Sequence, residues 1–242
     1  MLMSGHSKWA NIKHRKGAQD AKKANVFTKM ARLISIAARE GGADLDTNFK
    51  LKMVVDKARS VNMPKDNIER AIKSGTGELK DGVVIEEIEY EAYGPGNIAM
   101  IIEVATDNKN RTVSELKHIL SKNGGKMVPN GSVGFLFKKS GVITVATKEG
   151  DDMDELELQA IDAGAEDTEV GEEVMVVYTK PEELQKTRNS LDKAGLQIEN
   201  AELAYVPIQS SEASEKEKES YERLYDALDE NDDVQQIYDN LG

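Results

Sequence analysis

The chain contains no cysteine among its 242 residues, and only one of them is tryptophan. Without cysteine there can be no disulfide, no thiol nucleophile and no cysteine-bound zinc, and this composition fits a reducing compartment. Apolar runs stay well short of the roughly 20 residues that span a bilayer. The N-terminus also lacks the apolar core of a secretory signal. We therefore expect a cytoplasmic protein without a membrane segment.

Catalytic motifs are equally scarce. The three histidines, His6, His14 and His118, lie outside the spacings of the zinc hydrolases, and neither a Gly-x-Ser-x-Gly sequence nor a Walker A sequence occurs. The acids of "GDDMDELE" (150–157) match no calcium loop. A metal site there is the weaker reading, because acids at a helix start stabilise the helix dipole. We expect no enzymatic activity, no cofactor, no metal and no small-molecule substrate.

Charge is abundant and unevenly divided. Residues 1–80 hold 17 Lys/Arg and 8 Asp/Glu, a net of +9, whereas the remainder holds 15 and 36, a net of −21. Such asymmetry predicts a front end that faces a polyanion and a solvated acidic body. The formal net charge of −12 for the whole chain conceals this division.

The basic part shows helical periodicity and predicts a three-helix bundle over residues 1–82. The first helix follows Gly17 and ends at Gly41, the second spans about 47–61, and the third begins at Pro64 and closes at Gly75. The apolar stripe of the first helix consists of Phe27, Ala31, Ile34 and Ala38. A roughly opposite basic face consists of Lys22, Lys29, Arg32 and Arg39. Leu33 and Ile36 interrupt that face, so another domain is expected to touch them.

Residues 5–16 have no period and predict an extended basic arm. Lys and Arg neutralise phosphates, and Trp or His can stack on bases. The alternative is a solvated tail with Trp9 as an anchor in the core, and Trp9 by itself favours that alternative. The candidate nucleic-acid-binding residues are His6, Lys8, Trp9, Lys13, His14, Arg15, Lys16, Lys22, Lys23, Lys29 and Arg32.

Alternation of period two begins at Glu86 and predicts an α/β domain over residues 83–139 with 208–242. A hairpin turns at "YGPGN" (93–97), a helix covers about 111–122, and Val133, Phe135 and Phe137 alternate as a third strand. The loop 126–132 before that strand is either a functional tip or a plain connector. Residues 210–220 are either a polar linker or a frayed helix start, and two short C-terminal helices are expected after them.

Residues 140–207 predict a second α/β domain in the order β-α-β-β-α-β, which is ferredoxin-like. Strands are expected at 141–147 and 200–206, with two more in "TEVGEEVMVVYT", and the helices carry Leu156 and Ile161 or Leu184, Leu191 and Ala194 inward. The net charge of −12 over residues 140–206 argues against phosphate binding there. The predicted fold class is α+β, with this domain inserted in the preceding one.

Several long motifs resemble the YebC/PmpR family. They are "GHSKWANIKHRKGAQDAKKANVFTKMARLISIAAREGG" (5–42), "NMPKDNIERAIKSGTG" (62–77), "YEAYGPGNIAMIIEVATDNKNRT" (90–112), "NGSVGFLF" (130–137) and "DDVQQIYDN" (232–240). The resemblance covers essentially the whole chain. It implies three domains and a cytoplasmic, non-enzymatic role in gene expression, with no family catalytic residue to transfer.

The family resemblance implies two functions. Members are labelled probable transcriptional regulators that bind DNA, and others are described as ribosome-associated translation factors that relieve stalling at proline-rich stretches. The residues favour ribosomal RNA over promoter DNA, because the irregular arm suits an irregular RNA surface. A major-groove recognition helix needs Arg, Asn or Gln at its start, whereas the first helix offers Gln19 and Asp20, then Lys. Ribosomal proteins are further candidate partners.

Overall fold

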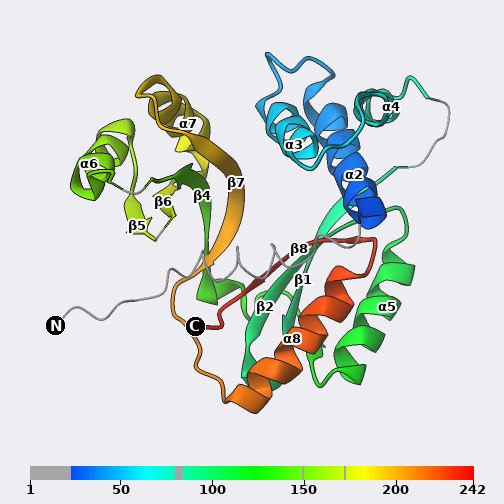
Figure 1. The fold of residues 1–242 in the computed structure, drawn as a ribbon. Coiled ribbons are helices and arrows are strands. Elements are labelled where there is room, and N and C mark those ends of the chain that lie inside the picture. Colours follow the sequence, from blue (N-terminus) through cyan, green and yellow to red (C-terminus); the bar gives the residue numbers. More distant parts are fainter. Residues whose placement is uncertain (1–22, 80–83, 149, 172) are drawn as a thin grey trace. The chain divides into compact units, whose positions relative to one another are not determined.

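The computed structural model describes residues 23–79, 84–148, 150–171 and 173–242. Its fold is mixed α+β, with two four-stranded sheets in the described residues. The described chain separates into two compact units (Figure 1). The larger unit consists of residues 22–138 and 207–242, and the smaller unit contains residues 139–206. The three-domain division stays a prediction.

Three helices form the first part of the larger unit, α2 (Lys23–Gly41), α3 (Phe49–Ser60) and α4 (Lys65–Gly75). Their apolar stripes meet in one core, in which Ile34, Leu51 and Ile68 are buried. Asn48 joins the first two helices: its side chain accepts from the Leu51 N–H that starts α3 (3.0 Å) and donates to the Ala37 carbonyl of α2 (2.7 Å). The periodicity of the sequence therefore predicted α3, α4 and the end of α2 correctly, whereas the predicted start of the first helix after Gly17 lies outside the described residues.

The α/β part of the larger unit is a sheet in the order β3-β1-β2-β8. Its strands are β1 (Glu86–Tyr93), β2 (Ala99–Thr106), β3 (Lys126–Val128) and β8 (Val234–Asp239), and all three pairings are antiparallel. The helices α5 (Lys109–Lys122) and α8 (Glu215–Asp229) lie side by side against it (Figure 1). Leu116, Leu120, Tyr221 and Leu224 of these helices are fully buried against the strands.

Two sequence predictions for this part are wrong. The segment 133–137 is not a strand: β3 precedes it, the short 3-10 helix η2 (Gly134–Leu136) occupies it, and the next strand begins at Phe137. The chain also does not end in two helices, because "DDVQQIYDN" contains β8. That segment completes the sheet by pairing Ile102 with Ile237 along the free side of β2, an edge that would otherwise leave backbone groups unpaired.

The smaller unit follows the predicted order of elements. These are β4 (Phe137–Ala146), α6 (Met153–Ala163), β5 (Asp167–Val170), β6 (Val174–Thr179), α7 (Leu184–Lys193) and β7 (Ile198–Pro207). The short 3-10 helix η3 (Pro181–Glu183) precedes α7, and a similar one, η1 (Pro95–Asn97), forms the turn between β1 and β2 of the larger unit. The strand order is β5-β6-β4-β7. Leu184 and Leu191 are buried as expected, but Ile161 is exposed and Ala160 faces the core instead.

Candidate functional site

Most of the candidate contact residues lie outside the described residues. This holds for His6, Lys8, Trp9, Lys13, His14, Arg15, Lys16 and Lys22. Lys23 begins α2, but its side chain is not among those described. Lys29 and Arg32 on α2 are the two candidates whose side chains the structure places. Nucleic-acid contact by the whole set therefore stays a prediction.

Lys29 and Arg32 bind acidic partners from the far end of the chain. The Lys29 Nζ donates to the carboxylate and the carbonyl of Asp229, at 2.9 and 2.7 Å, and Lys29 is only 8% exposed. The Arg32 guanidinium donates to the Asp233 carboxylate at 2.6 Å and to the carbonyls of Asp232 (2.6 Å) and Ala105 (3.0 Å). These contacts attach α2 to the α/β part of the larger unit.

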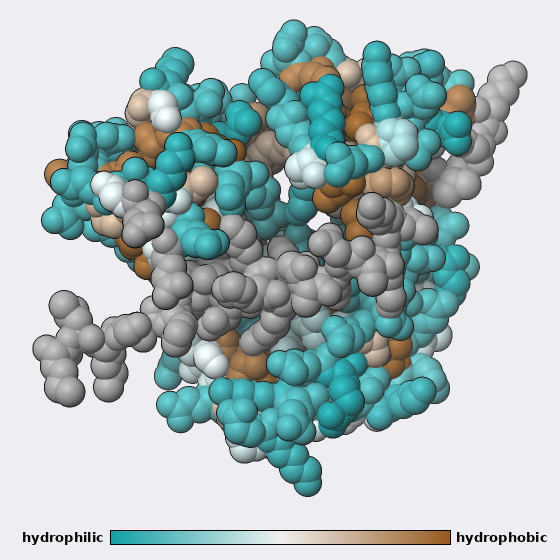
Figure 2. Space-filling model, viewed as in Figure 1, coloured by the Kyte–Doolittle hydropathy of each residue, from teal (hydrophilic) through white to brown (hydrophobic). Residues whose placement is uncertain are grey.

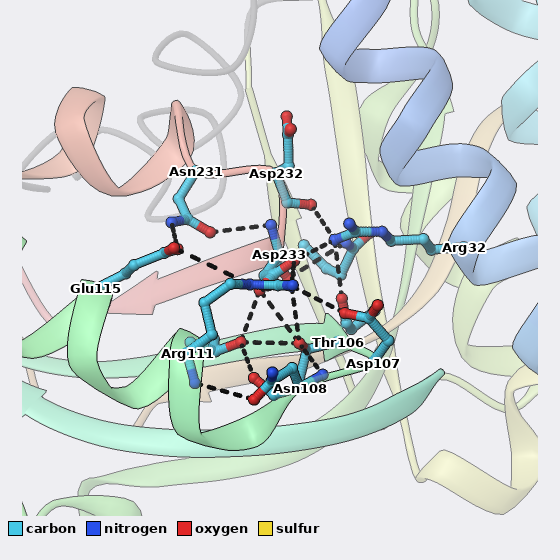
Figure 3. A network of polar contacts seen from close by, with 12 residues as sticks. Arg32, Thr106, Asp107, Asn108, Arg111, Glu115, Asn231, Asp232 and Asp233 are labelled. Carbon is cyan, nitrogen blue, oxygen red and sulfur yellow. Dashed lines mark hydrogen bonds and ion pairs between the residues drawn. The ribbon is translucent and has the colours of Figure 1, made fainter. Parts of the chain in front are cut away.

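Asp233 lies at the centre of this polar network (Figure 3). Its carboxylate, which is 4% exposed, accepts from Thr112 Oγ1 at 2.6 Å and from Arg111 at 2.9 and 3.1 Å, in addition to Arg32. Burial by itself would raise the pKa of Asp233. The hydrogen bonds from Thr112, Arg111 and Arg32 together outweigh burial, so the pKa lies below its ordinary value.

Neighbouring side chains complete the network and fix its backbone. Asn231 donates to Glu115 at 2.8 Å and accepts from the Asp233 N–H at 2.9 Å. Asn108 caps α5 by accepting from the Arg111 N–H at 3.1 Å. The network brings together "DNKNRT" (107–112), "NDD" (231–233) and α2 (Figure 3). Charges of opposite sign meet throughout it, so we interpret it as a structural junction and not as a reaction centre.

A second site is built by Glu91 on β1. Its carboxylate accepts three backbone N–H groups from one loop, those of Gly131 (2.7 Å), Val133 (2.5 Å) and Gly134 (3.1 Å). Burial raises the pKa of Glu91, but the three backbone donors outweigh it and lower the pKa overall. These N–H groups are therefore unavailable to a strand ladder, and this is why 133–137 is not a strand despite its alternation.

We call residues 129–136 the clamped loop, and its tip is Phe135. Phe135 is 69% exposed, and Ile208, whose N–H donates to the Leu136 carbonyl at 2.9 Å, is 65% exposed. On the face of the molecule in Figure 2 hydrophilic residues predominate, and hydrophobic residues reach the surface in separate patches. Among the residues that the structure describes, Phe135 is the one aromatic side chain that is exposed.

The chain around the clamped loop is basic, although the surrounding body is acidic. Residues 116–148 contain six lysines and neither aspartate nor glutamate. Lys117 and Lys122 on α5 and Lys126 on β3 are exposed. Averaging the charge over residues 81–242 hid this stretch, and a search for runs without acids would have found it.

The acids of 150–157 behave as helix-start residues. Asp152 is the N-cap of α6 and accepts from the Glu155 N–H at 3.2 Å, while Asp154 and Glu155 occupy the first turn. In the part of the chain that the structure covers, no cluster of His, Asp and Glu could hold a metal ion. Within the same residues, no helix combines the length and the apolar character needed to cross a membrane.

Two successive stretches of the chain match the domain models of one protein family. The family described as "TACO1/YebC protein N-terminal domain" matches residues 7–78, and "TACO1/YebC second and third domain" matches residues 85–241. The chain therefore belongs to the TACO1/YebC family, and its predicted resemblance is confirmed.

Individual relatives agree with this assignment. A protein of Fervidobacterium nodosum named "probable transcriptional regulatory protein" is 52% identical over 99% of this chain and 94% of its own length. One of Thermotoga maritima with the same name is 48% identical over the same shares of the two chains. The crystal structure of a conserved hypothetical protein from Aquifex aeolicus is 42% identical, with a TM-score of 0.84 over 92% of this chain and 91% of that chain.

Proposed function

We propose that this chain is a non-enzymatic, nucleic-acid-binding regulator of gene expression, and that it acts in the cytoplasm as a translation factor on ribosomal RNA, relieving stalling at proline-rich stretches. The observation that carries the proposal is the charge division, +9 over residues 1–80 against −21 over the rest. Basic groups concentrated at one end of an acidic protein are typical of binding to phosphates. The stalling role rests on the family resemblance alone.

The proposed contact falls mainly on the segment before α2. Lys29 and Arg32 already bind Asp229 and Asp233, so contact with phosphate would require them to exchange partners. The remaining proposed contacts to nucleic acid are Lys8, Lys13, Arg15, Lys16 and Lys22, together with His6, Trp9, His14 and Lys23. We also propose the three-domain arrangement, 1–82, 83–139 with 208–242, and the inserted acidic domain 140–207.

Binding to promoter DNA is the second candidate, and the names of the relatives favour it. Within its described residues, however, α2 is poorly equipped to read a major groove. The Asn25 amide donates to the Glu230 carbonyl at 3.3 Å, and Arg32 is bound to Asp233. Such groups, when free, are the ones that read base edges. This observation supports RNA over duplex DNA.

The test replaces Lys13, Arg15 and Lys16 together by Ala in the full chain. Ribosomes and a promoter fragment are each titrated with wild type and variant, and crosslinking identifies the nucleic acid bound after sedimentation. We expect at least tenfold weaker binding and a log–log salt slope smaller by about 2, from 0.7–0.9 per lost phosphate contact. The melting temperature should stay unchanged or rise slightly, because three like charges within four residues, with no acidic residue between Met1 and Lys16, no longer repel one another.

The matched control replaces Lys180, Lys186 and Lys193, three exposed lysines of the smaller unit, by Ala. It removes the same charge from acidic surroundings and should leave binding within about twofold. Equal weakening by both triple variants would contradict a dedicated basic site. Recovery of promoter DNA in place of ribosomal RNA would transfer the function to the second candidate.

A further inference from the structure

We propose that the clamped loop is a second nucleic-acid contact, in which the Phe135 ring stacks on an unpaired base of RNA. This inference rests on the proposed nucleic-acid binding, but it concerns a different part of the chain. It draws on three observations: the fixed backbone of the loop, the outward ring of Phe135 and the exposed lysines of the two elements that precede the loop in the chain.

The backbone of the loop is fixed before any partner arrives. Glu91 holds three of its N–H groups, and two further hydrogen bonds close it from within. Ser132 Oγ donates to the Pro129 carbonyl at 2.6 Å, and the Leu136 N–H donates to the Val133 carbonyl at 2.9 Å. Gly131 has φ +88°, a conformation that favours glycine. A contact made by this loop therefore requires little further ordering.

The clamp also sets the direction of Phe135. Val133 and Phe137, two residues to either side, are buried at 0% and 6% exposure, whereas Phe135 is 69% exposed. Leaving a phenyl ring in water forgoes about 2 kcal/mol of burial. A ring held outward on a fixed loop is suited to contact with a flat partner.

Charge indicates which partner fits. The chain reaches the loop through α5 and β3, which carry the exposed lysines Lys117, Lys122 and Lys126 within the acid-free stretch 116–148. The carboxylate that contacts the loop, that of Glu91, accepts hydrogen bonds from the loop's own backbone N–H groups. An exposed aromatic ring together with lysines on the elements that lead into its loop is a combination suited to single-stranded nucleic acid, which is bound by stacking and phosphate contact.

The partner must offer unpaired bases. In a duplex the base faces are already stacked on one another, so a ring on a surface loop cannot reach them without unstacking the helix. RNA loops, bulges and ends present free base faces. The clamped loop therefore fits folded RNA, and a protein partner would need an apolar surface with acids, for which no observation speaks.

The experiment compares Phe135→Ala with wild type on two fluorescent probes, an RNA hairpin with a large unpaired loop and a blunt DNA duplex of equal charge. Stacking of one base on an aromatic side chain corresponds to roughly tenfold in affinity. We expect Phe135→Ala to bind the hairpin about tenfold more weakly and the duplex within twofold of wild type. Phe135→Tyr, which keeps the ring, should restore hairpin binding.

Leu158→Ala is the matched control, because Leu158 is 62% exposed on the acidic helix α6. It should change neither affinity. A direct signal comes from Phe135→Trp with Trp9 kept: stacking of the new ring on bases should add a quenching of tryptophan fluorescence that wild type, which has Trp9 alone, does not show.

The outcomes separate the two proposals. If wild type binds neither probe, the proposed function falls and this inference falls with it. If wild type binds the hairpin and Phe135→Ala binds it equally well without the added quenching in the tryptophan variant, only the clamped-loop contact is overturned. Normal hairpin binding with lost ribosome association would show that the loop docks on protein, and this result also overturns the inference.

Discussion

Replacing Asp233 by Asn tests whether the polar junction holds α2 to the α/β part of the larger unit. The substitution keeps the shape of the side chain but removes its charge and one acceptor oxygen. Arg32 and Arg111 would lose their shared partner, and the new amide NH2 would face the Thr112 hydroxyl and the guanidinium groups. The side chain is 4% exposed, so water cannot readily replace what is lost.

The expected magnitude follows from burial on the two sides of the junction. Breaking a buried pair by removing one partner costs about 3–5 kcal/mol. Arg32 and Arg111 are 20% and 41% exposed, so water can solvate them in part and reduces the loss. We therefore expect Asp233→Asn to lower the free energy of unfolding by about 2–3 kcal/mol. For a protein of this size that corresponds to a melting temperature lower by about 5–10 °C.

Urea unfolding at pH 7, followed by circular dichroism, measures the effect, and Asp232→Asn is the matched control. Asp232 is the exposed neighbour, and its backbone carbonyl, not its side chain, accepts from Arg32. The control should change stability by less than about 0.5 kcal/mol. Equal effects of the two substitutions would refute the assignment of the junction to the Asp233 carboxylate.

The same pair of variants has a predictable pH dependence. The pKa of Asp233 is lowered in the folded protein from an ordinary value of 3.8. A lowered pKa means that the stabilisation is present above the unfolded value and is lost as the pH falls through the folded value. The difference between wild type and Asp233→Asn should thus stay constant from pH 7 to about pH 5 and shrink below about pH 4. A constant difference down to pH 2 would contradict this cause.

Two further substitutions test the other contacts. Glu91→Gln should lower the free energy of unfolding at pH 7 by about 1–2 kcal/mol, since three partly exposed N–H groups of the clamped loop lose a charged acceptor. Because the pKa of Glu91 is lowered from 4.5, the loss should fade on acidification below about pH 4.5. An equal loss at pH 7 and pH 3 in urea titrations would count against the clamp. Gly75→Ala should lower the free energy of unfolding by about 1–3 kcal/mol, since its Cβ would lie 2.2 Å from the Ser35 carbonyl oxygen of α2. The control is Lys73→Ala, an exposed change on the same helix, which should leave the melting temperature nearly unchanged. An unchanged melting temperature for Gly75→Ala would show that α4 can shift away from α2.

Local periodicity in the sequence determined most of the secondary structure. The stripe with Ile34 and Ala38 predicted α2, the alternation on both sides of "YGPGN" predicted the hairpin of β1 and β2, and the order of elements in the smaller unit followed from turns and stripes. Charge counted along the chain also indicated the basic front end before any coordinate was known. These features depend on neighbours within a few residues, which is the range that a pattern reports.

Tertiary structure alone decided three other features. The segment 234–239 is a strand because the edge of β2 offers it backbone partners, although its own pattern resembles a short helix. Residues 133–136 lie in an alternating stretch of the sequence but are not part of a strand, because Glu91, 42 residues before Val133, accepts the N–H groups of Val133 and Gly134. Lys29 and Arg32 belong to the basic face that the sequence predicts, and their acidic partners stand about 200 residues away in the chain. A side chain's partner depends on which distant segments the fold brings together, and local sequence does not specify that choice.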